Sequence, residues 1–293
     1  MMRAARLHTL GGTPQVDEID EPRADTIVDV AASALNPVDV SIATGRFYGG
    51  TPELPYVIGS EAVGTLPDGR RIWLRARGSL AERVAPAAEE WVEIPDGVDD
   101  AMALACGVAG VTGWLAVSWR AQVTAADTVL VLGASGSVGA AAVQGARVLG
   151  AKRVIGVARH VERVPDAADE AVGLDAELPP ADVIVDGLWG EPAERALAAA
   201  APHVRFVQLG QSAGPVASLQ SGWVRGKPAN LLGHSLFSTP PEVLARGYRE
   251  LCEHARDGRI SFATDVFALE EIAAAWERQS SGSPGAKIVV TVS

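Results

Sequence analysis

The pattern of hydrophobic and polar positions changes near residue 100. Before this point the apolar runs are short, at residues 26–35, 57–66, 71–74, 81–86 and 91–94, and Pro, Gly and Asp separate them. Short runs between turn signals predict β-strands. The Pro67-Asp68-Gly69-Arg70 sequence predicts a tight hairpin, because an Asp-Gly pair favours the backbone of such turns.

Strands and helices alternate in the middle of the chain. Residues 99–117 are rich in Ala and Leu and predict a helix interrupted at Gly107 and Gly110. Uninterrupted apolar runs at 129–132, 154–158, 183–186 and 204–209 predict strands that are buried on both faces. Residues 138–149 and 192–201 predict helices between them. This alternation indicates a doubly wound parallel sheet.

The last fifty residues return to a mixed pattern, with a helix predicted from Pro240-Pro241 to about residue 258, a short strand, a helix at 269–279 and a strand at 286–292. We therefore predict an α/β fold class, with a Rossmann domain and a second, mostly β domain built from both ends of the chain. The predicted boundaries are 108–239 for the Rossmann domain, and 1–107 with 240–293 for the other.

Three glycines, Gly133, Gly136 and Gly139, join the strand at 129–132 to the helix at 138–149. Glycines at this spacing allow a sharp turn, a close approach of the backbone to a pyrophosphate, and tight packing of the helix on the strand. The phosphates then bind unpaired N–H groups at the helix N-terminus. A purely structural turn is the alternative, but the strand and helix around the loop favour a dinucleotide site.

The end of the next parallel strand indicates which dinucleotide binds. NAD-binding folds place an acid about 20 residues after the glycines, where it binds the ribose hydroxyls. Here Arg159 directly follows the strand at 154–158, Arg163 lies four residues further on, and the first acid is Glu162. Two guanidinium groups suit a 2′-phosphate, which favours NADPH over NADH. The alternative is that both arginines are solvated surface residues.

Charge and composition exclude several classes of protein. The net charge is −11, which disfavours nucleic acid as a partner. Two cysteines, Cys106 and Cys252, cannot form a four-cysteine zinc site. The N-terminus lacks the apolar core of a signal peptide, and polar residues interrupt the longest apolar stretch. We therefore expect a cytoplasmic protein without a membrane partner.

Six motifs follow one another in an order that is typical of one family. They are Asn36-Pro37-Val38-Asp39, the segment 55–64 (PYVIGSEAVG), the glycine loop, the segment 182–186 (DVIVD), Ser235-Leu236-Phe237 and the segment 285–290 (GAKIVV). In this order they resemble the zinc-independent quinone oxidoreductase branch of the medium-chain dehydrogenase/reductase superfamily. The resemblance implies a GroES-like catalytic domain beside the Rossmann domain, and a homodimer formed through the sheet edge near residues 230–237.

Two related chemistries fit the chain poorly. The zinc-dependent branch needs a thiolate where this chain has Pro37-Val38-Asp39 and an imidazole where it has Ser60, so no metal site is expected. The short-chain reductases use a Tyr-x-x-x-Lys pair. None of the three tyrosines here has a lysine four residues later.

Hydride transfer without a metal favours an acceptor that spreads negative charge by conjugation. The resemblance implies an NADPH-dependent, metal-independent reductase of quinones or α,β-unsaturated carbonyls, of the quinone oxidoreductase or enoyl reductase type. Its substrate would be a small-molecule carbonyl or quinone. A non-catalytic NADPH-binding sensor or structural protein is the alternative, because the same glycine loop would serve it.

The resemblance places Asn36, Asp39 and Tyr48 near the nicotinamide and substrate. Each has a structural alternative, because Asn36 and Asp39 can cap a helix at 38–45 and Tyr48 can pack in its loop. The cofactor-side residues are Thr112, Ser135, Gly136, Ser137, Val138, Gly139, Arg159, Arg163, Gly210, Gln211, Ser235, Leu236, Phe237 and Lys287. Among these, Thr112 can be a cap, residues 235–237 an edge strand, and Lys287 a solvated charge on an edge strand.

One departure from the family pattern concerns the adenine side of the predicted site. The stretch between Arg163 and Asp182 is short and is expected to lack most of one strand–helix unit. The part of the wall that this unit builds in the family is therefore in doubt.

Overall fold

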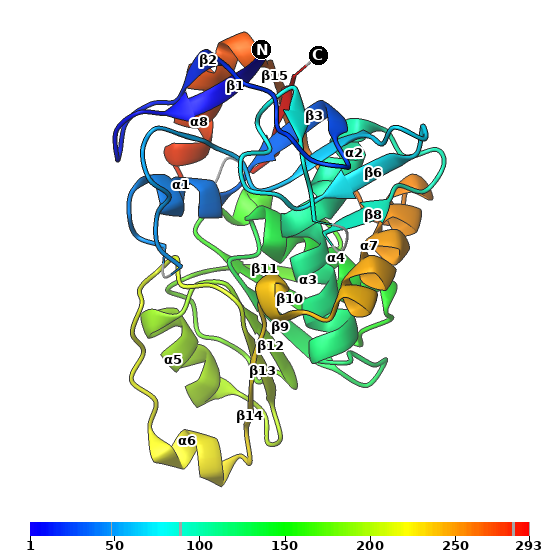
Figure 1. The fold of residues 1–293 in the computed structure, drawn as a ribbon. Coiled ribbons are helices and arrows are strands. Elements are labelled where there is room, and N and C mark those ends of the chain that lie inside the picture. The colour runs from blue at the N-terminus through cyan, green and yellow to red at the C-terminus, as the bar shows by residue number, and fades with distance from the viewer. Residues whose placement is uncertain (48, 88–89, 283–284, 293) are drawn as a thin grey trace. The chain divides into compact units, whose positions relative to one another are not determined.

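A computed structural model describes the chain except for residues 48, 88–89, 283–284 and 293 (Figure 1). The chain forms two compact units. The first, here called the β-rich unit, contains Met1–Val108, Tyr248–Arg256 and Ser261–Ser293. The second, here called the Rossmann unit, contains Ala109–Gly247 and Asp257–Ile260. The Rossmann unit thus extends past residue 239, and the predicted domain boundaries stay a prediction.

The Rossmann unit is built on six parallel strands in the order β11-β10-β9-β12-β13-β14 (Figure 1). Counted along the chain this is 3-2-1-4-5-6, the order of dinucleotide-binding sheets. The predicted α/β class with a doubly wound parallel sheet is confirmed. The strands are β9 (Thr128–Leu132), β10 (Arg153–Ala158), β11 (Glu170–Gly173), β12 (Val183–Asp186), β13 (Arg205–Gln208) and β14 (Asn230–Gly233).

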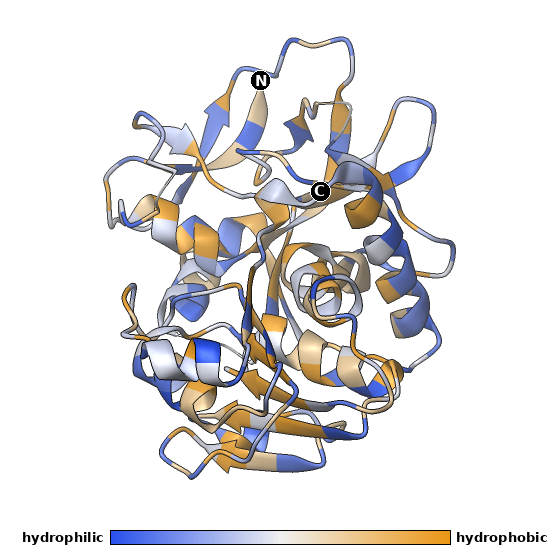
Figure 2. Cartoon of the chain, turned by 90° about the horizontal axis from the view of Figure 1, so that it is seen from below, coloured by the Kyte–Doolittle hydropathy of each residue, from blue (hydrophilic) through white to orange (hydrophobic). Residues whose placement is uncertain are grey.

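Helices cover both faces of this sheet. On one face Val129 and Val131 of β9 pack with α4 (Ser137–Val148), and on the other Leu130 and Leu132 pack with α5 (Gly190–Ala199). Alternate side chains therefore enter two separate cores, which explains why the strand is apolar throughout. Figure 2 shows these strands mainly in the hydrophobic colour. The unit also contains α3 (Thr112–Leu115), η2 (Ala116–Arg120) and α6 (Ser221–Gly226).

The shortened segment after Arg163 keeps its strand. A single turn, η3 (Val161–Arg163), leads into β11, which pairs with β10 from Ile155↔Glu170 to Ala158↔Gly173. We expected this segment to lack most of one strand–helix unit. This expectation was wrong for the strand, because β11 is present. Residues 164–182, which the structure describes in full, contain no helix. β11 escaped prediction because an edge strand with exposed residues has little apolar pattern.

The β-rich unit contains two sheets, with the strand orders β2-β1-β4 and β15-β16-β3-β5-β6-β8, and β7 pairs with β3. The predicted hairpin is confirmed, since β5 and β6 are antiparallel and Thr65 faces Arg71. The strands are β1 (Met2–Leu7), β2 (Gln15–Ile19), β3 (Val28–Leu35), β4 (Tyr56–Val57), β5 (Ala62–Thr65), β6 (Arg71–Leu74), β7 (Arg83–Val84), β8 (Trp91–Glu93), β15 (Thr264–Ala268) and β16 (Lys287–Thr291).

The helices of the β-rich unit include α1 (Pro37–Ala43), α2 (Asp100–Ala105) and α8 (Ile272–Ser280), which follows the turn η5 (Leu269–Glu271). The helix α7 (Pro241–Arg256) contributes Tyr248–Arg256 to this unit. The Tyr248 ring stacks on Trp73 with 4.5 Å between the ring centroids. Both side chains are fully buried and anchor α7 on the sheet.

The helical stretch Asp100–Arg120 passes through α2, η1 (Cys106–Val111), α3 and η2. Of the two glycines predicted to interrupt it, Gly107 leaves helical geometry, with φ −60° and ψ −139°. A Cβ at Gly107 would lie 2.0 Å from Glu61 Oε2, so the position requires glycine. Among the described residues this stretch is long and apolar enough to cross a bilayer, but 78% of its most apolar window is buried inside the protein.

Candidate functional site

A buried polar cluster lies at one edge of the larger sheet in the β-rich unit. We use "buried polar cluster" for Asn36, Asp39, Ser60, Glu61 and Lys287. Asn36 is the N-cap of α1 and Asp39 lies in the first turn of that helix. Ser60 and Glu61 precede β5, and Lys287 begins β16.

The pairing of three strands explains why residues so far apart in sequence meet here. β3 lies between β16 and β5, with Leu35 opposite Ile288 and Ser33 opposite Ala62. The residues just beyond these pairs therefore emerge at the same edge of the sheet.

Glu61 is the centre of the cluster. It is completely buried, and its carboxylate accepts four hydrogen bonds. Lys287 Nζ at 2.5 Å and Asn36 Nδ2 at 2.8 Å donate to Oε1. Trp73 Nε1 and the Val108 N–H, each at 2.7 Å, donate to Oε2. A buried carboxylate is tolerated when it is paired and hydrogen-bonded in this way.

The same contacts fix the side-chain amide of Asn36. Lys287 Nζ donates to Asn36 Oδ1 at 2.6 Å. Asn36 Nδ2 donates to Glu61 and also to Ser60 Oγ at 3.2 Å. The amide oxygen faces a cation and the amide nitrogen faces acceptors, so a flipped amide would lose its partners.

Asp39 combines a structural contact with an unusual titration. Its Oδ2 accepts the Asn36 N–H at 2.7 Å, which is the capping contact of the structural alternative, and the Ser60 hydroxyl at 3.2 Å. Burial raises the pKa of Asp39 to about 7. The bonds from Asn36 and Ser60 and the charge of Lys287 oppose this shift, while the Glu61 charge adds to it.

The structure describes Lys287 but not Tyr48, another predicted site residue of this unit. Tyr48 lies outside the described residues. The solvated edge-strand alternative for Lys287 is wrong, because Lys287 is 4% exposed and β16 lies between β15 and β3. Its ammonium group binds Glu61 and Asn36, and its contact with a cofactor stays a prediction.

Sequence reasoning did not assign a role to Glu61, Ser60 or Tyr56. The signal for Glu61 was an acid inside an otherwise apolar segment, just as Lys287 lies inside another. The Tyr56 hydroxyl is buried and has no hydrogen-bond partner among the described residues. Burial and the Asp39 charge both raise the pKa of Tyr56.

The glycine loop of the Rossmann unit has the predicted geometry. Gly133 has φ +79°, and the N–H groups of Gly133 and Ala134 donate to the Val157 carbonyl at 2.9 and 3.1 Å. A Cβ at Gly139 would lie 2.2 Å from the Gly133 carbonyl oxygen. Gly136, as the N-cap of α4, has no side chain to occupy the first turn. Ser135, Ser137 and Val138 lie in this loop and turn.

Arg159 and Arg163 lie just beyond the carboxyl end of β10. Both side chains are exposed. Arg159 follows the strand directly, two residues after the carbonyl that binds the glycine loop. Arg163 ends η3, and its Nε is 4.0 Å from Glu162 Oε1.

The remaining cofactor-side residues also belong to the Rossmann unit. Thr112 begins α3, and its carbonyl accepts the His234 Nε2 at 3.2 Å. Gly210 and Gln211 follow β13. Ser235 caps the single turn η4 (Leu236–Ser238), which contains Leu236 and the exposed Phe237. The edge-strand alternative for residues 235–237 is wrong, because β14 ends at Gly233.

Two buried polar residues of the Rossmann unit were not predicted as site residues. Asp186 ends β12, and its Oδ1 accepts the N–H groups of Leu188 and Trp189 at 2.8 and 3.0 Å. His234 follows β14, and burial lowers its pKa to about 4. Asp186 Oδ2 and His234 Nδ1 have no hydrogen-bond partner among the described residues. In the sequence, each of the two is recognisable as a polar residue at the end of a predominantly apolar strand.

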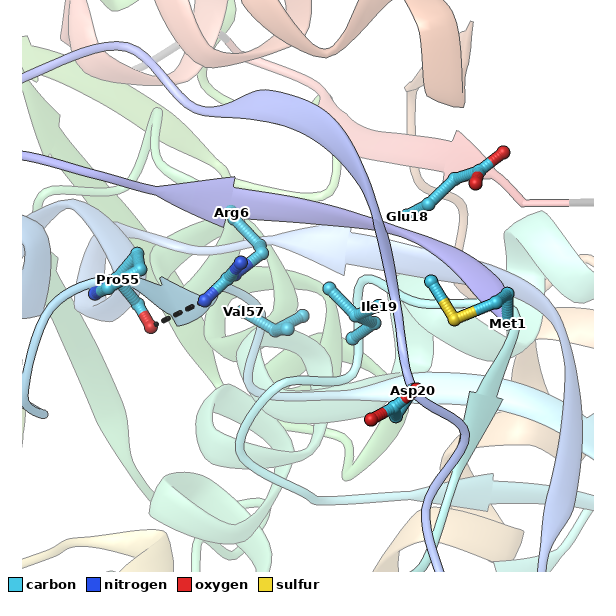
Figure 3. Close-up of a pocket in the computed structure, with 7 residues that line it drawn as sticks. All are labelled: Met1, Arg6, Glu18, Ile19, Asp20, Pro55 and Val57. Atoms are coloured by element: carbon cyan, nitrogen blue, oxygen red, sulfur yellow. Dashed lines mark hydrogen bonds between the residues drawn. The ribbon is translucent and has the colours of Figure 1, made fainter.

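A cavity of about 390 Å³ lies beside β1, β2 and β4 in the β-rich unit (Figure 3). Arg6 Nη2 donates to the Pro55 carbonyl across it at 3.1 Å. None of the predicted site residues lines this cavity. Among the described residues no three His, Cys, Asp or Glu side chains gather as metal ligands would.

Sequence relatives match the chain over different lengths. The family described as zinc-binding dehydrogenase matches residues 149–290. A phenolphthiocerol/phthiocerol polyketide synthase of Mycobacterium tuberculosis is 28% identical over 96% of this chain and 14% of that protein. Quinone oxidoreductase of Homo sapiens is 32% identical over 54% of this chain and 53% of that protein. The chain thus spans a small part of the first relative and about half of the second.

Solved structures match the chain over nearly its whole length. The quinone oxidoreductase from Thermus thermophilus, which was also solved with NADPH, is 27% identical with a TM-score of 0.85, and the match covers 99% of this chain and 100% of that one. An alcohol dehydrogenase superfamily protein from Novosphingobium aromaticivorans shares the fold, with 23% identity, a TM-score of 0.86 and 100% of each chain covered. With the motifs and the two units described above, these matches place the chain in the medium-chain dehydrogenase/reductase superfamily as a quinone oxidoreductase-like member.

Proposed function

We propose that this protein is an NADPH-dependent reductase that transfers hydride, without a metal, to a quinone or an α,β-unsaturated carbonyl. The observation that carries the proposal is the glycine loop at the carboxyl end of β9, where the strand order of the sheet reverses. Ligands of open α/β sheets bind at such a reversal. The relatives named quinone oxidoreductase, and the NADPH complex of the Thermus enzyme, support this activity.

The loop fits the pyrophosphate of a dinucleotide. Because Gly139 has no Cβ, α4 can lie close to the loop. Gly136 leaves the first turn of the helix without a capping side chain. The N–H groups of residue 135 and of residues 137–139 would bind the pyrophosphate, whereas that of Gly136 donates to the Gly133 carbonyl at 3.0 Å. The exposed Arg159 and Arg163 would bind the 2′-phosphate, as their fork of donors suits a phosphate. When bound, NADPH supplies the hydride.

The other predicted cofactor residues would serve the nicotinamide half. They follow the strands β13 and β14 or begin α3, and are Thr112, Gly210, Gln211, Ser235, Leu236 and Phe237. Lys287 would act indirectly, since its ammonium group is bound to Asn36 and Glu61.

Asn36 and Asp39 are the proposed catalytic residues in the β-rich unit, and Tyr48 stays a prediction. Lys287 and Glu61 hold the Asn36 amide in one orientation. Both amide hydrogens of Asn36 are bound, one to Glu61 and one to Ser60, so Asn36 would act by fixing the polar groups beside the acceptor oxygen. A fixed donor at that oxygen stabilises the charge that develops there. The donor set also supports metal independence, because Ser60 and Asp39 offer neither thiolate nor imidazole and Glu61 is saturated by four donors.

We also propose a homodimer through the edge strand β14, which pairs with β13 on one side and carries the 46% exposed Leu231. The cytoplasmic location stays a prediction.

An oxidation assay tests the activity. We expect purified protein to oxidise NADPH in the presence of quinones or enones, followed by the loss of NADPH absorbance, and to use NADH less well. NADPH binding without turnover on any acceptor of either class would refute the reductase and favour the non-catalytic NADPH-binding protein. Turnover that depends on added zinc would refute metal independence.

Replacing Arg159 and Arg163 together with Ala tests the cofactor choice. We expect the KM for NADPH to rise about 100-fold, because hydrogen bonds to charged groups contribute about 1.5–3 kcal/mol each. The KM for NADH should stay nearly unchanged, since NADH lacks the 2′-phosphate. Arg225→Ala, an exposed arginine of α6, is the control and should alter neither value. An equal loss for both cofactors would contradict the assignment.

A further inference from the structure

Ser60 differs from the other members of the buried polar cluster in its exposure. Asn36, Asp39, Glu61 and Lys287 are each at most 4% exposed. Ser60 is partly exposed and yet hydrogen-bonds to two of them. Its hydroxyl donates to Asp39 Oδ2 at 3.2 Å and accepts from Asn36 Nδ2 at 3.2 Å. Within this cluster, Ser60 therefore connects a buried carboxyl group to the outside.

We propose that Ser60 is a further catalytic residue, which delivers a proton to the oxygen of the reduced acceptor, and that the buried Asp39 is the source of this proton. The proposal rests on the proposed function. Hydride transfer to a conjugated carbonyl or quinone leaves an oxyanion, and the reaction is complete only when that anion receives one proton.

The transfer balances in atoms and charge. The Ser60 O–H bond breaks as a new O–H bond forms on the acceptor oxygen, and the Asp39 carboxyl proton passes to Ser60 Oγ. Asp39 is left as a carboxylate that accepts the Asn36 N–H and the Ser60 hydroxyl. The structure shows this arrangement of contacts. A proton from water then restores the Asp39 acid, and no other reactant is needed.

Serine has the hydrogen-bonding capacity for this role. A hydroxyl donates once and accepts twice. While Ser60 donates to the acceptor oxygen, its two lone pairs can accept the Asp39 carboxyl proton and the Asn36 amide. Asn36 thus positions Ser60, and Lys287 and Glu61 position Asn36.

The charges around Asp39 make it a suitable proton source. Lys287 from β16 and Glu61 from the segment before β5 act on its carboxyl group in opposite directions. Tyr56 of β4 is its titratable neighbour, and the charged residues of α8, Glu277 and Arg278, are exposed. With a pKa of about 7, Asp39 exists in both forms near neutral pH, which suits a general acid.

Two other groups of the region fit the role less well. Four donors occupy the Glu61 carboxylate, so a proton there would displace one of them. The Tyr56 hydroxyl has no hydrogen-bond partner among the described residues and so has no direct connection to Asp39.

The test uses two acceptors that differ in their need for a proton. One is an enone, whose enolate must be protonated. The other is a quinone with several halogens, whose reduced anion is stable at neutral pH. With the enone, wild-type kcat should fall about tenfold per pH unit above the pKa of Asp39, because only the protonated carboxyl group reloads Ser60.

Ser60→Ala should lower kcat for the enone about 100-fold, the usual scale of general acid catalysis, and should remove this pH dependence. With the halogenated quinone its kcat should stay within about threefold of wild type. Asp39→Asn, which keeps the acceptor for the Asn36 N–H, should lose the same pH dependence. Ser60→Thr should restore the enone activity, because it keeps the hydroxyl.

Ser280→Ala, at an exposed serine of α8, is the matched control and should behave as wild type with both acceptors. An equal loss with both acceptors in Ser60→Ala would show a structural role and overturn the proposal. An unchanged pH profile in Ser60→Ala would do the same. If the wild-type protein reduces neither acceptor, the proposed function itself fails.

Discussion

Lys287→Met is expected to lower the free energy of unfolding by about 3–5 kcal/mol, the usual cost of removing one partner from a buried ion pair. Glu61 would remain in a fully buried position without the cation that now lies 2.5 Å from its carboxylate. Asn36 would lose the donor to its Oδ1 at the same time. Urea denaturation followed by tryptophan fluorescence measures the loss.

Lys152 offers a matched control, because it is exposed and its replacement by Met should change stability by no more than about 0.5 kcal/mol. Combining Lys287→Met with Glu61→Met should recover part of the lost stability, since no charge is then left buried without a partner. A Lys287→Met protein as stable as the Lys152→Met protein would show that the ion pair is not buried in solution.

Gly139→Ala is expected to weaken NADPH binding by about 10- to 100-fold, which corresponds to the roughly 1–3 kcal/mol of strain that overpacking causes. The new Cβ would lie 2.2 Å from the Gly133 carbonyl oxygen and 2.8 Å from Ala134 Cα. Both are backbone atoms, so α4 and the loop must separate and the N–H groups of the loop lose their positions. Titration of NADPH fluorescence measures the affinity.

The control for this change is Gly222→Ala in α6, where a Cβ would meet no atom within 4 Å. Alanine favours helix there, so stability should stay the same or rise slightly, and NADPH affinity should not change. If Gly139→Ala binds NADPH as tightly as Gly222→Ala does, the glycine loop is not the dinucleotide site.

The Rossmann unit was largely predictable because its signals are local. The run at 129–132 is apolar at every position, since both of its faces are covered, and the three glycines follow it directly. Periodicity and turn chemistry act over a few residues and can be recognised in one sequence. β11 was missed for the same reason, since an exposed edge strand needs few apolar residues.

The buried polar cluster could not be assembled from the sequence in this way. Asn36 and Asp39 were recognised through a motif, and their capping contact is local. The sequence alone did not show that Glu61 and Lys287, 226 residues apart, form an ion pair, or that Ser60 joins Asp39 and Asn36. From the sequence, Lys287 could also have been a solvated charge, because the sequence does not show whether its strand lies at the edge of a sheet.

By itself, the sequence determined the α/β fold class, the glycine loop with its flanking elements, and the family to which the motifs belong. The tertiary structure alone decided which charges are buried, which partners they have, and therefore that the pKa of Asp39 lies near 7. The physical reason is that burial and strand pairing depend on residues far apart in the chain, whereas a turn or a cap depends on its neighbours.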